Sequence, residues 1–309
     1  MNQFAIAIHG GAGTILKKDI TAGQEAAYIN GLEEALHAGY TILEKGGTAL
    51  AAITAATVSL EDCILFNAGR GSVFTKTGTH EMDAAIMDGK TLGAGAVAGV
   101  GAVKNPVELA LSIMEQSEHV LLSGEGALQF AKKQGLRIEN EKYFFSQFRY
   151  DQWQLVKNED AVALDHNIQI EKKFGTVGAV ACDVYGNLAA ATSTGGMTNK
   201  NYNRIGDTPV IGAGTYANNQ TCAISCTGHG EIFLKAVAAY DVSCLMEYKG
   251  MTLQQAMETV TLDKLVKING EGGMIGADAK GNTALVFNSE GMYRAMQNSK
   301  GEKQIAIYR

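Results

Sequence analysis

The stretch that most constrains the fold of this chain runs over residues 174–196 and reads FGTVGAVACDVYGNLAAATSTGG. Val177 to Val184 is rich in small and β-branched residues without a helical period, and Leu188 to Thr194 is a second apolar run. The Tyr-Gly-Asn between them supplies turn residues. The stretch therefore predicts a β-hairpin, in which Thr176 faces Thr192 to Thr194 across the sheet.

Thr176 has two readings. A threonine that opens a strand is ordinarily structural, because its branched Cβ suits a pleated surface. It becomes a strong nucleophile when its own freed α-amino group acts as the base, which requires a cut between Gly175 and Thr176. From about Glu139 to Lys173 the pattern dissolves into charges and scattered aromatics, which predicts a mobile linker and a suitable place for a new chain end. The residues alone leave both readings open.

Helices and further strands are predicted on both sides of the hairpin. Apolar spacing and capping residues predict helices over 22–45, from Thr48 to about 60, from Pro106 onward, and over 126–133, 228–246 and 252–266. Short apolar runs predict strands over 4–8, 82–87 and 95–103, and MIGADAKGNTALVF repeats the turn pattern of the first hairpin. Two hairpins flanked by helices indicate a mixed α/β protein.

Bulk properties exclude several classes of function. The 309 residues can bury a sizeable core, and 46% hydrophobic with 19% charged residues is an ordinary globular composition. The net charge of −6 argues against a nucleic-acid partner, and no apolar run is long enough to span a bilayer. We expect no signal peptide, and five cysteines without C-x-x-C spacing favour reduced thiols. These features predict a cytoplasmic protein without a nucleic-acid or membrane partner.

Three motifs favour the second reading of Thr176, in which it is a nucleophile. GTVGAVACDVYGNLAAATSTGGMTNK, NRIGDTPVIGAGTYANN and SCTGHGE occur in this order, and the chain resembles the plant-type (type III) asparaginases, or isoaspartyl aminopeptidases, of the N-terminal nucleophile hydrolases. The likeness runs from the opening IHGGAG to the closing GMYRA. It implies a four-layer αββα sandwich and a homodimer of αβ units. Residues 1–175 would form the α subunit, with a linker at about 139–175, and residues 176–309 the β subunit of one structural domain.

The resemblance also implies a reaction. The Thr176 hydroxyl would attack the carbonyl carbon of Gly175, and water would hydrolyse the resulting ester and separate the subunits. Gly175 suits this step because a residue without Cβ tolerates strained backbone. The freed amine of Thr176, with an ordinary pKa near 8, would then serve as the base in hydrolysis of β-aspartyl dipeptides and of L-asparagine.

Further site residues follow from the motif match. The resemblance implies that the Thr227 hydroxyl and the Gly228 amide stabilise the oxyanion, that Thr194 hydrogen-bonds the nucleophile, and that Asn67 supplies an amide donor near the substrate. Arg204 would bind the substrate α-carboxylate and Asp207 its α-ammonium, although the two residues alone read as a surface pair. Asn203 stands where the family usually has glycine, and asparagine tolerates left-handed backbone.

The resemblance implies a structural metal but no catalytic cofactor. The loop over 60–70 would hold a sodium ion, a hard cation that prefers oxygen ligands, through the backbone carbonyls of Leu60, Glu61, Cys63, Phe66, Ala68 and Arg70. His9 and His80 are predicted to be structural. The chain has no G-x-S-x-G or H-E-x-x-H motif that would indicate another hydrolytic centre.

Two alternatives remain. A glycosylasparaginase shares the threonine nucleophile and the Arg/Asp pair, and TGHGE is compatible with it, whereas FNAGRGSVFT and STGGMTNK favour the asparaginase branch. A non-catalytic amino-acid binding module that never matures would keep the Gly175–Thr176 bond intact.

Overall fold

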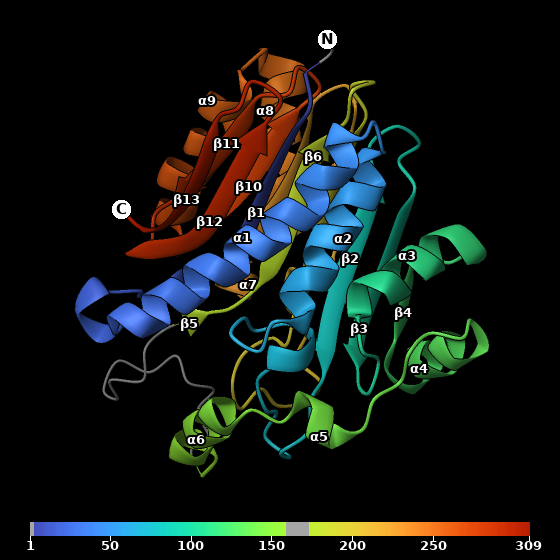
Figure 1. Ribbon diagram of the computed structural model, residues 1–309, viewed down its shortest axis with the longest axis vertical. Coiled ribbons are helices and arrows are strands. Elements are labelled where there is room, and N and C mark those ends of the chain that lie inside the picture. The colour runs from blue at the N-terminus through green and yellow to red at the C-terminus, as the bar shows by residue number, and fades with distance from the viewer. Residues whose placement is uncertain (1–2, 159–172) are drawn as a thin grey trace.

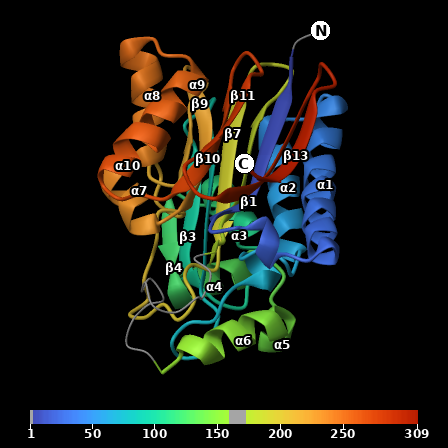
Figure 2. The same ribbon diagram turned by 90° about the vertical axis from the view of Figure 1, so that its left-hand side faces the viewer.

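The structure is a computed structural model that describes residues 3–158 and 173–309. Two β-sheets pack face to face and are covered by helices on their outer faces, as Figures 1 and 2 show. One outer layer is made by α1 (Ala22–Glu44), α2 (Ala49–Asp62) and α3 (Pro106–Gln116). The other is made by α7 (Gly230–Ala236), α8 (Ala238–Lys249), α9 (Leu253–Glu258) and α10 (Leu265–Lys267). The predicted four-layer αββα sandwich is confirmed.

In the described part of the chain the larger sheet has nine strands. Its order is β13 (Lys303–Tyr308), β12 (Gly291–Asn298), β1 (Ala5–Gly13), β6 (Val177–Cys182), β7 (Leu188–Thr194), β2 (Met82–Asp88), β3 (Ala94–Val100) and β4 (Leu121–Ser123), and β5 (Lys173–Phe174) pairs with β1. The smaller sheet has the order β11 (Thr283–Phe287), β10 (Gly272–Asp278), β9 (Cys222–Gly228) and β8 (Thr215–Ala217).

Three hydrophobic clusters fill the spaces between the four layers. The first lies between α1 to α3 and the large sheet, and the second between the small sheet and α8 to α10. The third lies between the two sheets and is built largely from small side chains, among them Ala7, Ala190, Ala217 and Ala223. Small residues let the two sheets approach closely, so polar side chains from one sheet can contact those of the other.

The predicted hairpin is confirmed. β6 and β7 pair antiparallel, with Val177 opposite Ser193 and Gly178 opposite Thr192. β7 also pairs with β2, where Asp83 lies opposite Thr194. This register brings Thr176, at the start of β6, to the end of β7.

The helix predicted over 228–246 is wrong as a single element. It begins at Gly230 and is interrupted at Val237, whose φ of 48° lies in the left-handed region. Beyond the interruption the amides of Ala239 and Tyr240 donate to the carbonyls of Ala213 and Gly212, at 3.2 and 2.8 Å. Tertiary hydrogen bonds to the 212–213 loop therefore replace the helical ones. The helix predicted over 252–266 is likewise divided, by a π-helical segment over Thr259–Lys264.

The predicted linker is wrong over its first half. Residues 141–156 contain α5 (Glu141–Phe144) and α6 (Gln147–Val156), which follow α4 (Gly124–Lys133) around one end of the sheets in Figure 1. Phe144 is buried, and the Trp153 ring stacks on Phe74 with centroids 5.6 Å apart. The aromatic side chains hold these short helices on the domain despite the charged composition. Residues 159–172 of the predicted linker lie outside the described residues.

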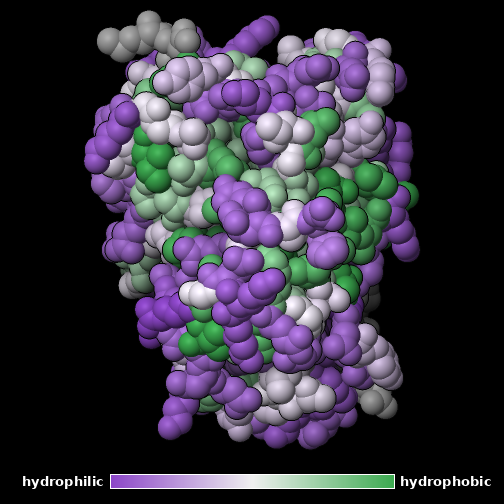
Figure 3. All heavy atoms as spheres, turned by 90° about the vertical axis from the view of Figure 1, so that its right-hand side faces the viewer, coloured by the Kyte–Doolittle hydropathy of each residue, from purple (hydrophilic) through white to green (hydrophobic). Residues whose placement is uncertain are grey.

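None of the helices in the described ranges is both long and apolar enough to cross a membrane. The face that carries α3 and α4 shows small apolar patches between polar side chains (Figure 3).

Candidate active site

The Thr176 side chain lies in a short hydrogen-bonded chain that leads back to the peptide bond before it. The Thr176 hydroxyl donates to Oγ1 of Thr194 at 3.3 Å, and the Thr194 hydroxyl donates to the carbonyl oxygen of Gly175 at 2.9 Å. The Gly196 amide donates to the same Thr194 oxygen at 3.0 Å. Thr176 is 7% exposed. This arrangement offers a proton path from the hydroxyl to the carbonyl that it would attack.

Asn67 supports this arrangement from the neighbouring loop. Its side-chain amide donates to the carbonyl of Gly196 at 2.7 Å, and its side-chain oxygen accepts from the Val73 amide at 3.0 Å. A Cβ at Gly175 would lie 2.4 Å from Cβ of Asn67, so only glycine fits there. Asn67 therefore lies beside the Gly175–Thr176 bond, where it positions the 195–196 turn.

Thr227 and Gly228 end strand β9. The Ala12 amide donates to the Thr227 hydroxyl oxygen at 3.2 Å, which leaves the hydroxyl proton available for an acceptor in the site. Gly228 has a φ of 151°, and a Cβ there would lie 2.4 Å from the carbonyl oxygen of Glu271. The close approach of β9 and β10 at this point requires glycine.

Arg204 and Asp207 are brought together beside Gly230, at the start of α7. A Cβ at Gly230 would lie 2.6 Å from Nη2 of Arg204 and 3.0 Å from Oδ1 of Asp207. The Arg204 guanidinium donates from Nε and Nη2 to both carboxylate oxygens of Glu231, at 2.8 Å each. Glu231 was missed in the sequence, although its place next to the TGHG motif is a signal that an acid borders the site.

Asp207 is a buried carboxylate, 5% exposed, and its Oδ2 has no hydrogen-bond partner within the described residues. Burial raises the pKa of Asp207 to about 7, against the favourable interaction with Arg204. A buried acceptor without a donor is costly, so this side chain has capacity to bind a cationic group.

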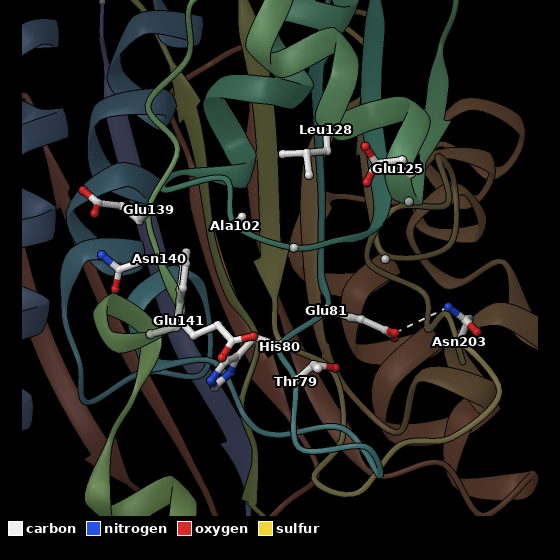
Figure 4. Close-up of a pocket in the computed structure, with 14 residues that line it drawn as sticks. Thr79, His80, Glu81, Ala102, Glu125, Leu128, Glu139, Asn140, Glu141 and Asn203 are labelled. Carbon is white, nitrogen blue, oxygen red and sulfur yellow. Dashed lines mark hydrogen bonds between the residues drawn. The ribbon is translucent and has the colours of Figure 1, made fainter.

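Asn203 takes up the left-handed backbone that the sequence predicts, with a φ of 53°. Its side-chain amide donates to Glu81 at 3.4 Å and thereby ties the 200–207 segment to the strand that carries Asp83 (Figure 4). The pocket in Figure 4 has a volume of about 620 Å³ and borders this contact. Its lining includes Asn203 and the carboxylates of Glu125, Glu139 and Glu141, but none of the predicted site residues.

His9 lies directly behind the nucleophile candidate. It is fully buried, and its Nδ1 lies 2.9 Å from the carbonyl oxygen of Thr176. Burial lowers the pKa of His9 to about 3, so the ring is neutral at physiological pH. The sequence predicted a structural role for His9 and gave no sign of its contact with Thr176.

The loop over 60–71 fits a cation bound by backbone oxygens. No cluster of three or more histidine, cysteine or acidic side chains suited to a metal ion occurs in residues 3–158 and 173–309. In the loop, a Cβ at Gly71 would lie 2.0 Å from the carbonyl oxygen of Phe66, and one at Gly69 would lie 2.6 Å from that of Glu61. Glycine is therefore needed where these carbonyl oxygens approach the loop backbone closely, and backbone oxygens are the donors that a hard cation prefers.

The chain is similar to known proteins over almost its whole length. A protein-family model described as asparaginase matches residues 2–307. The chain is 51% identical to the isoaspartyl peptidase of Salmonella typhimurium, with all of both chains covered, and 50% identical to that of Escherichia coli, with 100% and 97% covered. It is 41% identical to the plant-type L-asparaginase of Pyrococcus horikoshii, with 98% and 99% covered.

Proposed function

Since the chain belongs to the asparaginase family of N-terminal nucleophile hydrolases, we propose that it is an autoprocessing hydrolase of β-aspartyl dipeptides and L-asparagine. The observation that carries this proposal is a pair of hydrogen bonds in series: the Thr176 hydroxyl donates to Thr194, and the Thr194 hydroxyl donates to the carbonyl oxygen of Gly175. The relatives are named isoaspartyl peptidases and plant-type L-asparaginases, which favours this activity over that of a glycosylasparaginase.

Maturation begins with attack of the Thr176 hydroxyl oxygen on the carbonyl carbon of Gly175. As the C–O bond forms, the hydroxyl proton passes to Thr194, and the Thr194 proton is shared with the developing oxyanion. The proton then moves from this oxygen to the nitrogen of Thr176, the Gly175 carbonyl re-forms as the C–N bond breaks, and the nitrogen leaves as a neutral amine. Water hydrolyses the remaining ester. The products are a chain ending in the carboxylate of Gly175 and a chain beginning with the free amine of Thr176.

Turnover uses the same oxygen on a different carbonyl. Thr176 attacks the side-chain carbonyl carbon of the aspartyl group, and its own amine takes the hydroxyl proton and passes it to the departing ammonia or amino acid. The Thr227 hydroxyl and the Gly228 amide stabilise the oxyanion; each such donor contributes roughly 2.7–4 kcal/mol in comparable sites. Water then hydrolyses the aspartyl ester and releases L-aspartate.

Recognition of the aspartyl half rests on opposite charges. The Arg204 guanidinium binds the α-carboxylate through N–H donors of its planar fork that are not used by Glu231, which takes one donor from Nε and one from Nη2. The unpartnered oxygen of Asp207 accepts from the α-ammonium. The leaving group makes none of these contacts, so both dipeptides and asparagine fit the same site.

The direct test is incubation of the purified protein with L-asparagine and with a β-aspartyl dipeptide. We expect aspartate to appear in equal amount with ammonia or with the second amino acid, and denaturing mass spectrometry to find fragments 1–175 and 176–309. An uncut chain that binds these compounds without hydrolysing them would instead identify an amino-acid binding module.

The pKa of Asp207 predicts a pH dependence of recognition. Because this pKa is raised to about 7, the carboxyl is protonated at lower pH and cannot pair with an α-ammonium. We expect the kcat/KM for asparagine, divided by that for succinamate, which lacks the α-amino group, to fall about tenfold per pH unit below 7. The division cancels the titration of the Thr176 amine. A ratio that stays constant from pH 5.5 to 7.5 would remove Asp207 from this role.

We also propose a structural sodium ion, with no catalytic cofactor. The ion would be held by backbone carbonyls of Leu60, Glu61, Cys63, Phe66, Ala68 and Arg70, and it would fix the loop that carries Asn67. Sodium chloride is expected to raise the Tm by about 2–6 °C relative to choline chloride of equal ionic strength. Equal Tm values in the two salts would exclude the site.

A homodimer of αβ units in the cytoplasm completes the proposal. The five cysteines are free in the structure, which supports a reducing compartment. Exposed Val120 and Leu121, at the start of the edge strand β4, offer apolar contact area to a second copy. Sedimentation should give twice the mass of one 32.7 kDa chain.

A further inference from the structure

A chain of buried hydroxyl groups leads from the interior to His9 and alternates between the two sheets. Nε2 of His9 in β1 lies 2.9 Å from Oγ of Ser225 in β9. Oγ of Ser225 lies 2.7 Å from Oγ1 of Thr192 in β7, which lies 2.7 Å from Oγ1 of Thr215 in β8. All four side chains are fully buried.

The register of the strands explains why these groups meet. His9 and Thr192 lie on either side of Gly178 in the large sheet, while Thr215 and Ser225 are paired in the small sheet. A Cβ at Gly178 would lie 2.0 Å from Oγ of Ser225 and 2.7 Å from Nε2 of His9. Glycine at 178 therefore opens the space in which Ser225 reaches between His9 and Thr192.

The hydrogen bonds of this chain have one consistent direction. The carbonyl oxygen of Thr176 only accepts, so Nδ1 of the neutral His9 ring carries the proton and Nε2 accepts. Ser225 must then donate to Nε2, Thr192 to Ser225, and Thr215 to Thr192. The two longer contacts, from Thr192 to the Gly214 carbonyl and from Thr215 to the Thr208 carbonyl, are both 3.2 Å and are the weaker alternatives.

We propose that Thr215, Thr192 and Ser225 are positioning residues for the nucleophile, which act by holding His9 in the orientation that binds the Thr176 carbonyl. This inference rests on the proposed function of Thr176. Aligned hydrogen bonds polarise one another, so the bond to Thr176 is strongest when the whole chain is intact.

The need for such a chain arises from maturation. Cleavage removes the covalent connection on the amino side of Thr176, and the residue must still present its hydroxyl and amine in a fixed geometry. The remaining restraints include its link to Val177, the 3.3 Å contact of its hydroxyl with Thr194 and the bond from His9 to its carbonyl, and only the last fixes its main chain from the interior. Small errors in the position of a reacting group lower the rate strongly, so loss of orientation should lower kcat while substrate binding at Arg204 and Asp207 is retained.

The test compares Thr192→Val, Thr192→Ser and Ser225→Ala with the parent enzyme. We expect Ser225→Ala and Thr192→Val to lower kcat about tenfold and to slow appearance of the 176–309 fragment, with KM for asparagine changed less than twofold. Thr192→Ser keeps the hydroxyl and should restore kcat. Ser243→Ala is the matched control. The buried Ser243 hydroxyl lies 2.7 Å from the Thr221 hydroxyl and takes no part in the hydrogen bonds that lead to His9.

The double variant Ser225→Ala/Thr192→Val separates the chain from general destabilisation. Because Thr192 acts only through Ser225, kcat of the double variant should equal that of Ser225→Ala. If both single variants keep the parent kcat and change only the Tm, as Ser243→Ala should, the positioning role is overturned. If Thr192→Val does not fold, the kcat of Ser225→Ala alone tests the positioning role. A parent chain that neither cleaves itself nor hydrolyses asparagine would overturn the proposed function instead.

Discussion

Replacement of Thr176 by alanine is expected to give a single uncut chain that releases no detectable aspartate from asparagine or from β-aspartyl dipeptides. The variant lacks the oxygen that forms both esters, in maturation and in turnover. Loss of a catalytic nucleophile lowers kcat on the order of 10⁴-fold to 10⁶-fold in comparable hydrolases. Denaturing mass spectrometry and an ammonia assay on the same sample measure the two effects.

Thr176→Ser is the matched control, because it keeps the hydroxyl and loses only the methyl group. It should still cleave and retain measurable turnover, whereas Thr176→Ala should keep the parent secondary structure and remain whole. Cleavage at residue 175 or aspartate release by the alanine variant would show that another group is the nucleophile. The short path from Thr176 to Thr194 would then be only a structural contact.

The parts of the fold that the sequence predicted are those with strong local signals. The helix over 22–45 has a capping box at Thr21 and ends just before a glycine with a φ of 78°. The hairpin has two apolar runs that pair antiparallel and a turn between them. Each of these elements is determined largely by its own residues.

The parts that were not predicted depend on distant neighbours. Strands β12 and β13 lie at the edge of the large sheet, and β12 becomes a strand by pairing with β1, at the other end of the chain. Val237 interrupts a helical pattern because the 212–213 loop binds the following amides. In both cases the partner lies far away in the sequence, so the residues near β12 or near Val237 do not reveal it.

The same distinction applies to the site. Thr194 and Thr176 share one hairpin, so their contact was predictable from the turn and the register. Glu231, by contrast, contacts Arg204 from the next helix, and Ser225 contacts His9 from the other sheet. Motif resemblance indicates which residues matter, but the packing of the two sheets decides which of them touch.

Arg204→Ala is expected to raise the KM for asparagine by roughly 10²-fold to 10³-fold while maturation proceeds at the parent rate. Truncation of one member of a desolvated charge pair costs about 2–5 kcal/mol, and the α-carboxylate would lose its bidentate partner. The side-chain hydrogen bonds of Arg204 in the described residues go to Glu231, away from the hydroxyl path of Thr176 and Thr194, so the cleavage step should not depend on it. Steady-state kinetics and the time course of fragment formation measure the two properties.

The charge of Arg204 also acts on Asp207, and this makes the prediction more specific. Arg204 lowers the pKa of Asp207, whereas Glu231 raises it. Removal of the guanidinium should therefore move the Asp207 titration to higher pH, so that part of the KM defect is recovered as the pH is raised from 7 to 8. Arg204→Lys keeps the charge but not the planar fork, and should show a raised KM without this added pH dependence. An alanine variant whose KM defect is the same at pH 7 and 8 would show that Arg204 and Asp207 bind the substrate independently.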